Sequence, residues 1–215
     1  MLVAATDTPR RSPAVRALKG LVLTLAATTT FAFAVSEQHA GPPQPAMADG
    51  HARAATAATR AAAPLPASRP LRVTVPAIRV DAPLMDLGLE DSGRLAAPPE
   101  IDKNLAGWWA GGPAPGAQGT AVIAGHVDVP NGPAVFYDLG ALTPGMKIGI
   151  SREDGTKARF IVDGVDVYDA DNFPDDKVYA DTGRPELRLI TCGGGFDKQR
   201  QQYEGNVVIA AHLVG

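Results

Sequence analysis

The chain has 215 residues, a formal net charge of −3 and a single cysteine. This length allows one domain with a sizeable core and an appended segment. The nearly neutral charge gives no indication of a protein that binds nucleic acid. A single cysteine cannot form an intramolecular disulfide, so Cys192 is either a small buried residue or a reactive thiol.

The first 35 residues have the pattern of an export signal. Residues 1–19 form a basic tail, and residues 20–35 are apolar and carry no charge. This stretch is shorter than the roughly 20 residues of a typical membrane span, so two interpretations stay open. We favour a single-pass membrane anchor with a cytoplasmic N-terminus, because the small-residue motifs at 46–48 and 52–54 lie late for signal cleavage. The alternative is a secreted protein, and both place the rest of the chain outside the cytoplasm, where a lone cysteine is reactive or pairs between molecules.

Residues 36–70 are rich in alanine, proline and small polar residues and show no strand alternation. Such a segment buries too little apolar surface to offset the entropy lost on ordering, which predicts a disordered linker. Alternating apolar and polar residues begin at residue 71, so residues 71–215 are predicted to form the folded domain.

The domain reads as mostly β-structure with scarce helix. A proline at position 76 predicts an edge or a break, and the residues EDGT between two apolar runs predict a hairpin. Short helices are expected over residues 104–109 and 133–142, and the adjacent Trp108 and Trp109 are expected to face opposite ways. The predicted strands cover residues 71–84, 119–128, 146–154, 157–169, 186–192 and 206–214. The break at position 76 divides the first range, and the run 157–169 continues through Asp163 and Gly164 into another strand. We therefore expect about seven or eight strands in a mostly antiparallel barrel or sandwich.

Cys192 ends the apolar run ELRLITC and precedes three glycines. A thiolate is a nucleophile, and a neighbouring histidine or cation lowers the pKa of the thiol. His126 is the best placed histidine, because it follows the strand pattern AVIAG where the chain must turn. The backbone at Gly193 and the next two residues is open to close approach by a substrate chain. Asp128 is expected either to orient the imidazole or to form the turn.

The remaining histidines are less suited to this chemistry. His39 and His51 lie in the predicted linker, and His212 lies near the C-terminus, where we expect a surface residue.

The sequence resembles the sortases, cysteine transpeptidases of Gram-positive cell surfaces, and within them the actinobacterial class F group. The resemblance covers roughly residues 71–213. It rests on VTVPAIRVDAPL (73–84), VIAGHVD (122–128), GPAVFYDLGALTPG (132–145), LITCGGGFD (189–197) and YEGNVVIAA (203–211).

The resemblance implies an eight-stranded β-barrel with short helices and an active site at the end of a groove. Cys192 would attack the Thr–Gly carbonyl of an LPXTG-like sorting signal in a secreted protein and form a thioacyl-enzyme. His126 would protonate the departing amine and then take a proton from the incoming amine, from a peptidoglycan precursor or a pilin lysine. Thr191 would orient the substrate near the same oxygen, and no metal or organic cofactor is implied.

The resemblance also implies an arginine that binds the substrate and the developing oxyanion, and here the sequence departs from the pattern. Relatives often carry this arginine next to the tyrosine before the last strand, whereas Glu204 follows Tyr203 here. Arg200 is the nearest candidate, and Arg188 or Asn206 are alternatives. Two other functions stay open: a catalytically inactive sortase-like barrel that acts as a surface binding module, and a thiol hydrolase that uses water.

Overall fold

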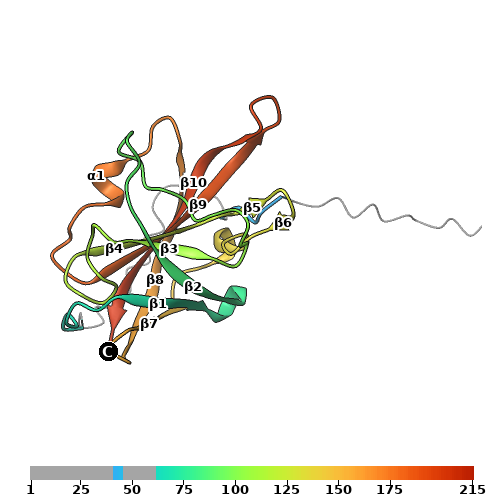
Figure 1. The fold of residues 1–215 in the computed structure, drawn as a ribbon. Helices are drawn as coiled ribbons and strands as arrows, with labels where there is room; N and C mark the ends of the chain where they lie inside the picture. Colours follow the sequence, from blue (N-terminus) through green and yellow to red (C-terminus); the bar gives the residue numbers. More distant parts are fainter. Residues whose placement is uncertain (1–40, 46–61) are drawn as a thin grey trace, which may run out of the picture. The chain divides into compact units, whose positions relative to one another are not determined.

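The computed structural model describes residues 41–45 and 62–215 of the chain. Within these residues the chain forms strands joined by turns and short helical segments (Figure 1). The helical segments are η1 (Pro76–Ile78), η2 (Leu139–Ala141) and α1 (Asp175–Val178). The strands are β1 (Pro70–Val75), β2 (Val80–Leu87), β3 (Ala106–Trp109), β4 (Thr120–Gly125), β5 (Asp128–Val129), β6 (Gly132–Pro133), β7 (Lys147–Arg152), β8 (Lys157–Asp169), β9 (Glu186–Asp197) and β10 (Gln202–Val214).

Eight of these strands close into a barrel in the order β1-β2-β3-β4-β9-β10-β8-β7, and β5 and β6 form a separate two-stranded sheet. The β2–β3 and β4–β9 pairs are parallel, and the other barrel pairs are antiparallel. Within the part of the chain that the structure describes, closure leaves the barrel without an open edge. The expected mostly β, eight-stranded barrel is therefore confirmed.

The expectation of a short helix over residues 104–109 is wrong, because Ala106–Trp109 form strand β3. This strand fills the place between β2 and β4, pairing parallel with one and antiparallel with the other. Backbone pairing on both sides outweighs the weak local preference of so short a segment. The helix expected over 133–142 is limited to η2, and Pro76 does break the strand, since it begins η1.

Side chains of the barrel strands alternate between an enclosed core and an outer face. Leu189 lies in the enclosed core, and the next residue, Ile190, lies in a second apolar cluster. Trp108 is buried in the core and Trp109 packs against the second cluster, so the two tryptophans do face opposite ways. We call this second group the outer cluster; its buried members are Val122, Val178, Ile190 and Val208.

The residues just before β1 already contact the barrel. Leu65 packs against the core, and its N–H donates to the carbonyl oxygen of Gly116 at 2.9 Å. Arg69 forms an ion pair with Asp86 at 3.0 Å. Contacts with the barrel thus begin several residues before position 71, where the sequence alternation starts.

The basic tail 1–19 and the apolar segment 20–35 lie outside the described residues, as does most of the predicted linker 36–70. Over residues 41–45 and 62–215, no helix is both long and apolar enough to cross a bilayer.

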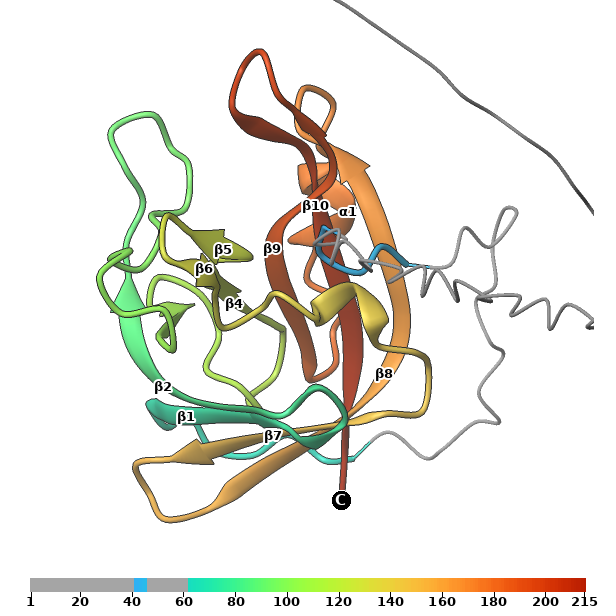
Figure 2. The same ribbon diagram turned by 90° about the vertical axis from the view of Figure 1, so that its right-hand side faces the viewer.

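Two loops rise from the end of the barrel opposite the C-terminus (Figure 2). One is the β2–β3 loop, residues 88–105, and the other is the β9–β10 hairpin, whose turn covers residues 198–201. Because β4 runs parallel to β9, the C-terminal ends of both strands lie at this end of the barrel.

Candidate active site

The predicted cysteine lies in β9, and the predicted histidine directly follows the neighbouring parallel strand β4. The pairing of the two strands sets Ala124 opposite Ile190, and the Thr191 hydroxyl donates to the carbonyl oxygen of Gly125. The backbone at His126 therefore follows a residue in contact with Thr191, the neighbour of Cys192, although His126 and Cys192 lie 66 positions apart in the sequence.

The ring of His126 is held by the β2–β3 loop. Its Nε2 atom lies 2.6 Å from the carbonyl oxygen of Pro98. A carbonyl oxygen can only accept a hydrogen bond, so Nε2 carries a hydrogen and donates it. Nδ1 is then the nitrogen that can take up a proton from a neighbouring group.

Cys192 is solvent-exposed and is the single cysteine of the chain. Protein atoms around the sulfur desolvate it in part, and this raises the pKa of the thiol. The negative charge of Asp128 raises the pKa further, whereas the positive charge of Arg94 opposes the rise. The thiol of the free protein is therefore mostly protonated at neutral pH, and the nucleophilic thiolate is the minor form.

Asp128 lies in β5, just after the histidine, and accepts a hydrogen bond of 2.5 Å from the hydroxyl of Tyr203. Burial, this hydrogen bond and the carboxylate charge all raise the pKa of Tyr203, so its phenol stays protonated and acts as a donor. The ring of Phe196 packs edge-on against Tyr203, with centroids 5.0 Å apart. Asp128 thus connects the turn that carries His126 to strand β10.

The other predicted substrate-binding positions have clear structural roles. Thr191 is buried, and its hydroxyl donates to the carbonyl oxygen of Gly125 at 2.8 Å. A Cβ atom at Gly193 would collide with the side chain of Val207, so close packing of β9 on β10 requires glycine there. Asn206 lies opposite Cys192 and donates through Nδ2 to the carbonyl oxygen of Thr191 at 3.4 Å.

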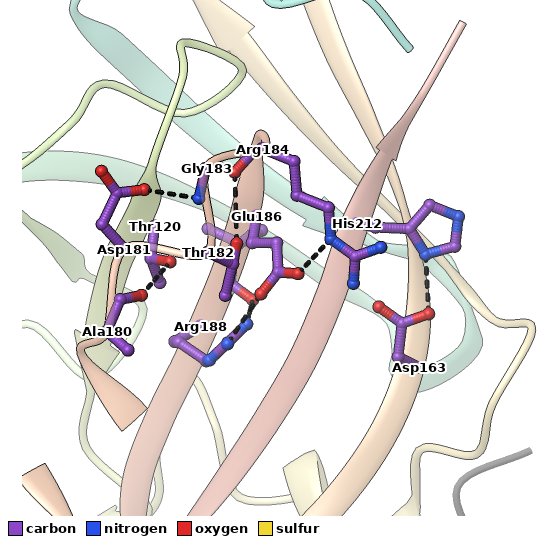
Figure 3. A network of polar contacts seen from close by, with 11 residues as sticks. Thr120, Asp163, Ala180, Asp181, Thr182, Gly183, Arg184, Glu186, Arg188 and His212 are labelled. Carbon is purple, nitrogen blue, oxygen red and sulfur yellow. Dashed lines mark hydrogen bonds and ion pairs between the residues drawn. The ribbon is translucent and has the colours of Figure 1, made fainter. Parts of the chain in front are cut away.

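Arg188 belongs to a closed polar network at the far end of β9 (Figure 3). Its Nη2 atom lies 2.8 Å from Oε2 of Glu186, and the two side chains are only 9% and 5% exposed. Arg184 binds the other carboxylate oxygen at 2.6 Å. Burial alone would raise the pKa of Glu186, but the hydrogen bonds and charges of the two arginines outweigh burial and lower it.

Figure 3 also shows His212, whose Nδ1 lies 2.6 Å from Oδ1 of Asp163 on the neighbouring strand. The side chain of His212 is partly buried, with 13% of its surface exposed. Its pairing between β8 and β10 is structural.

Arg200 lies in the turn of the β9–β10 hairpin. Its side chain is 67% exposed, and its Nε atom lies 3.5 Å from a carboxylate oxygen of Asp197. Cys192 and Asp197 are five residues apart on the same strand, which corresponds to roughly 16 Å at the usual rise. The hairpin therefore carries Arg200 away from the sulfur.

A short proline-rich part of the predicted linker, residues 41–45, reaches the backbone beyond the cysteine. Oε1 of Gln44 accepts a hydrogen bond of 3.1 Å from the N–H of Gly194. The carbonyl oxygen of Pro43 occupies the space that a Cβ atom at Gly140 would need.

The sequence did not indicate the part that the β2–β3 loop takes in this region. The carbonyl oxygen of Pro98 binds the ring of His126, and the charge of Arg94 lowers the pKa of the Cys192 thiol. Both residues belong to a loop without any recognisable motif. The Asp128–Tyr203 hydrogen bond joins residues 75 positions apart, so sequence spacing could not reveal it.

Comparison with known proteins agrees with this architecture. A sequence profile described as "Sortase domain" matches residues 73–214. Comparison with curated protein sequences gave no significant match.

Solved sortase structures share the fold. Sortase A from Corynebacterium diphtheriae aligns with a TM-score of 0.51 and 20% identity over 70% of this chain and 61% of that chain. Sortase C1 from Streptococcus suis aligns with a TM-score of 0.53 and 17% identity over 69% of this chain and 74% of that chain. Sortase C-1 from Actinomyces oris aligns with a TM-score of 0.52 and 20% identity over 67% of this chain and 73% of that chain. The family match, which spans well over half of the sequence, shows that the chain belongs to the sortase family.

Proposed function

We propose that the protein is an extracytoplasmic cysteine transpeptidase that cleaves an LPXTG-like sorting signal between threonine and glycine. We propose further that it belongs to the class F group, and the sequence motifs that resemble that group support this assignment. The observation that supports the proposal is the parallel pairing of β4 with β9, because His126 follows the end of β4 and the exposed thiol of Cys192 follows the paired part of β9.

In the first half-reaction, the Cys192 sulfur forms a bond to the carbonyl carbon of the threonine. The electron pair of the C=O bond moves to oxygen and then returns as the C–N bond to glycine breaks. The glycine nitrogen leaves with a proton from His126, which has taken the thiol proton. The product is a thioester on the enzyme and a free glycine amine.

In the second half-reaction, an amine attacks the thioester carbon. His126 removes a proton from that amine, and the sulfur leaves and regains a proton. The acceptor is an amine of a peptidoglycan precursor or a lysine of a pilin protein, so the reaction joins a secreted protein to the cell surface. This chemistry needs an exported domain, and the basic tail 1–19 and apolar segment 20–35 support anchoring in the cell membrane with the barrel outside.

The proposal is tested with the full-length chain and a peptide that contains Leu-Pro-Glu-Thr-Gly. Intact-mass measurement should show an acyl adduct on the wild type and none on Cys192→Ala. His126→Gln should form the adduct far more slowly, by about 100-fold or more. His212→Gln is the matched control, since His212 is paired within the barrel wall, and it should behave as the wild type.

Adding triglycine separates transfer from hydrolysis. A transpeptidase converts the thioester into a peptide–triglycine product, whereas a hydrolase releases the free acid. An intact peptide in every reaction, together with saturable binding of that peptide, would instead support an inactive binding module. Glu204, which stands where relatives often carry arginine, is the feature that favours this second candidate.

A further inference from the structure

In the proposed reaction, the resemblance implies an arginine that stabilises the oxyanion near Cys192, and two candidate arginines are engaged elsewhere. Arg188 is held by Glu186 at the opposite end of β9, where both side chains are nearly buried. Arg200 lies in an exposed hairpin turn beside Asp197. Neither arrangement directs a guanidinium at the sulfur.

The β2–β3 loop, residues 88–105, reaches this end of the barrel at two points. Leu95 packs against the outer cluster, which includes Ile190, two residues before the cysteine. Pro98 binds Nε2 of His126 through its carbonyl oxygen at 2.6 Å. The loop is thus fixed beside both residues of the proposed catalytic pair.

Arg94 immediately precedes the first of these contacts. It follows a tight turn in which the N–H groups of Glu90 and Gly93 donate to the carbonyl oxygens of Arg94 and Glu90, each at 2.8 Å. An isolated bridge between Leu89 and Leu95 closes the same turn. The backbone of Arg94 is therefore held in a defined position.

The guanidinium of Arg94 is exposed, and among residues 41–45 and 62–215 no hydrogen bond or ion pair engages it. Its positive charge opposes the rise in the pKa of the Cys192 thiol, which agrees with a position on the same side of the barrel as the sulfur. Arg94 therefore combines a fixed backbone beside the outer cluster with an exposed guanidinium that no described residue engages.

We propose that Arg94, supplied by the β2–β3 loop, is the arginine that binds the substrate carbonyl oxygen and stabilises the oxyanion. This inference rests on the proposed transpeptidase function. When sulfur attacks the threonine carbonyl, the electron pair moves to oxygen, and the N–H groups of the guanidinium donate to that O⁻. When the C–N bond breaks, the pair returns to re-form C=O, and the arginine neither gains nor loses a proton.

Two measurements test the assignment in the full-length protein. The first is the pH dependence of alkylation of Cys192 by iodoacetamide, which requires no peptide. The second is kcat/KM for cleavage of the Leu-Pro-Glu-Thr-Gly peptide. The variants are Arg94→Gln, Arg94→Lys and Arg200→Gln, with Arg72→Gln as the control, because Arg72 pairs with Asp81 at 2.7 Å on the barrel wall.

We expect Arg94→Gln to raise the thiol pKa, to slow alkylation at neutral pH and to lower kcat/KM by about 100-fold or more. Arg94→Lys should restore the thiol pKa but only part of kcat/KM, because an ammonium keeps the charge and loses the planar donor pair. Arg72→Gln should match the wild type in both measurements.

Full turnover by Arg94→Gln together with loss of turnover in Arg200→Gln would overturn the assignment in favour of the hairpin arginine. An unchanged thiol pKa in Arg94→Gln would overturn it as well. If the wild type does not cleave the peptide but Arg94→Gln still raises the thiol pKa, the transpeptidase proposal fails while the placement of Arg94 beside the sulfur stands.

Discussion

Charged groups are arranged differently at the start of strand β9 and in its middle. At the start, the nearly buried carboxylate of Glu186 binds two arginines, of which Arg188 is also nearly buried (Figure 3). In the middle, the carboxylate of Asp128 and the guanidinium of Arg94 shift the pKa of the exposed Cys192 thiol in opposite directions without an ion pair between them in the described part of the chain. The first arrangement is a closed network that stabilises the fold, whereas the second leaves the side chain of Arg94 exposed.

This contrast shows why nearness in sequence is a poor guide to the role of an arginine. Arg188 is four residues from the cysteine on the same strand, yet Glu186 holds it in the closed network. Arg94 is 98 positions away, yet its positive charge lowers the pKa of the Cys192 thiol. Only the packing of the β2–β3 loop against the barrel creates that second relationship.

The largest effect is expected when the closed network around Glu186 is broken. Glu186→Ala leaves Arg188 nearly buried without its carboxylate, and we expect the free energy of unfolding to fall by about 3 kcal/mol. Chemical denaturation measures this loss. Arg184→Ala is the matched control, because Arg184 is 54% exposed and its ion pair should contribute less than about 1 kcal/mol. Equal losses in the two variants would show that the network is not closed around Arg188.

Acid should weaken the stabilisation that the same network provides. The pKa of Glu186 is lower in the folded protein than in the unfolded chain, so the ionised carboxylate stabilises the fold above its unfolded pKa of about 4.3. This contribution is lost as the pH falls through the folded value. The difference in unfolding free energy between wild type and Glu186→Gln should therefore be largest near pH 6 and shrink toward pH 3. A difference that stays constant over this range would contradict the direction of the shift.

The sequence was sufficient to predict the fold class and to propose Cys192 and His126 as the reacting groups. Cys192 ends a short apolar run and His126 follows one, and local patterns of that kind are visible without a structure. Alternation and turn residues predicted a barrel or a sandwich, and the resemblance to sortases implied the eight-stranded barrel. The pairing of β4 with β9 was not predictable, because parallel neighbours 66 positions apart are selected by the whole barrel.

Other features depended on tertiary contacts that leave little local trace. The residues of β3 were assigned to a helix, since only the gap between β2 and β4 makes them a strand. The glycines after the cysteine were interpreted as room for a substrate, whereas Gly193 is required by the side chain of Val207. The loop that carries Arg94 has no periodicity at all, and its position depends on Leu95 and Pro98.

A smaller effect is expected at Thr191, next to Cys192. Thr191→Val keeps the side-chain volume but removes the hydrogen bond to the Gly125 carbonyl oxygen, which is next to His126. We expect the free energy of unfolding to fall by about 1 kcal/mol. We also expect kcat for peptide cleavage to fall several-fold. Thr191→Ser, which keeps the hydroxyl, should retain kcat. Equal kcat values for the valine and serine variants would show that this hydrogen bond does not position the histidine.

The smallest effect is expected at Asp128, near Cys192. Its removal should speed up alkylation of Cys192, whereas removal of the Arg94 charge should slow it. Asp128→Asn removes the negative charge that raises the thiol pKa, so the thiolate fraction at neutral pH should increase. Iodoacetamide is uncharged, and its reaction with Cys192 should become roughly two- to fivefold faster, the range expected for a partly screened surface charge. Part of the gain is offset, because a less basic thiolate is intrinsically less nucleophilic.

Tyr203→Phe is the control for this prediction. It removes the hydroxyl that binds Asp128 but keeps the carboxylate charge, so alkylation should not accelerate as it does in Asp128→Asn. Slower alkylation in Asp128→Asn would mean that the hydrogen bond to Tyr203, rather than the charge, controls the thiol.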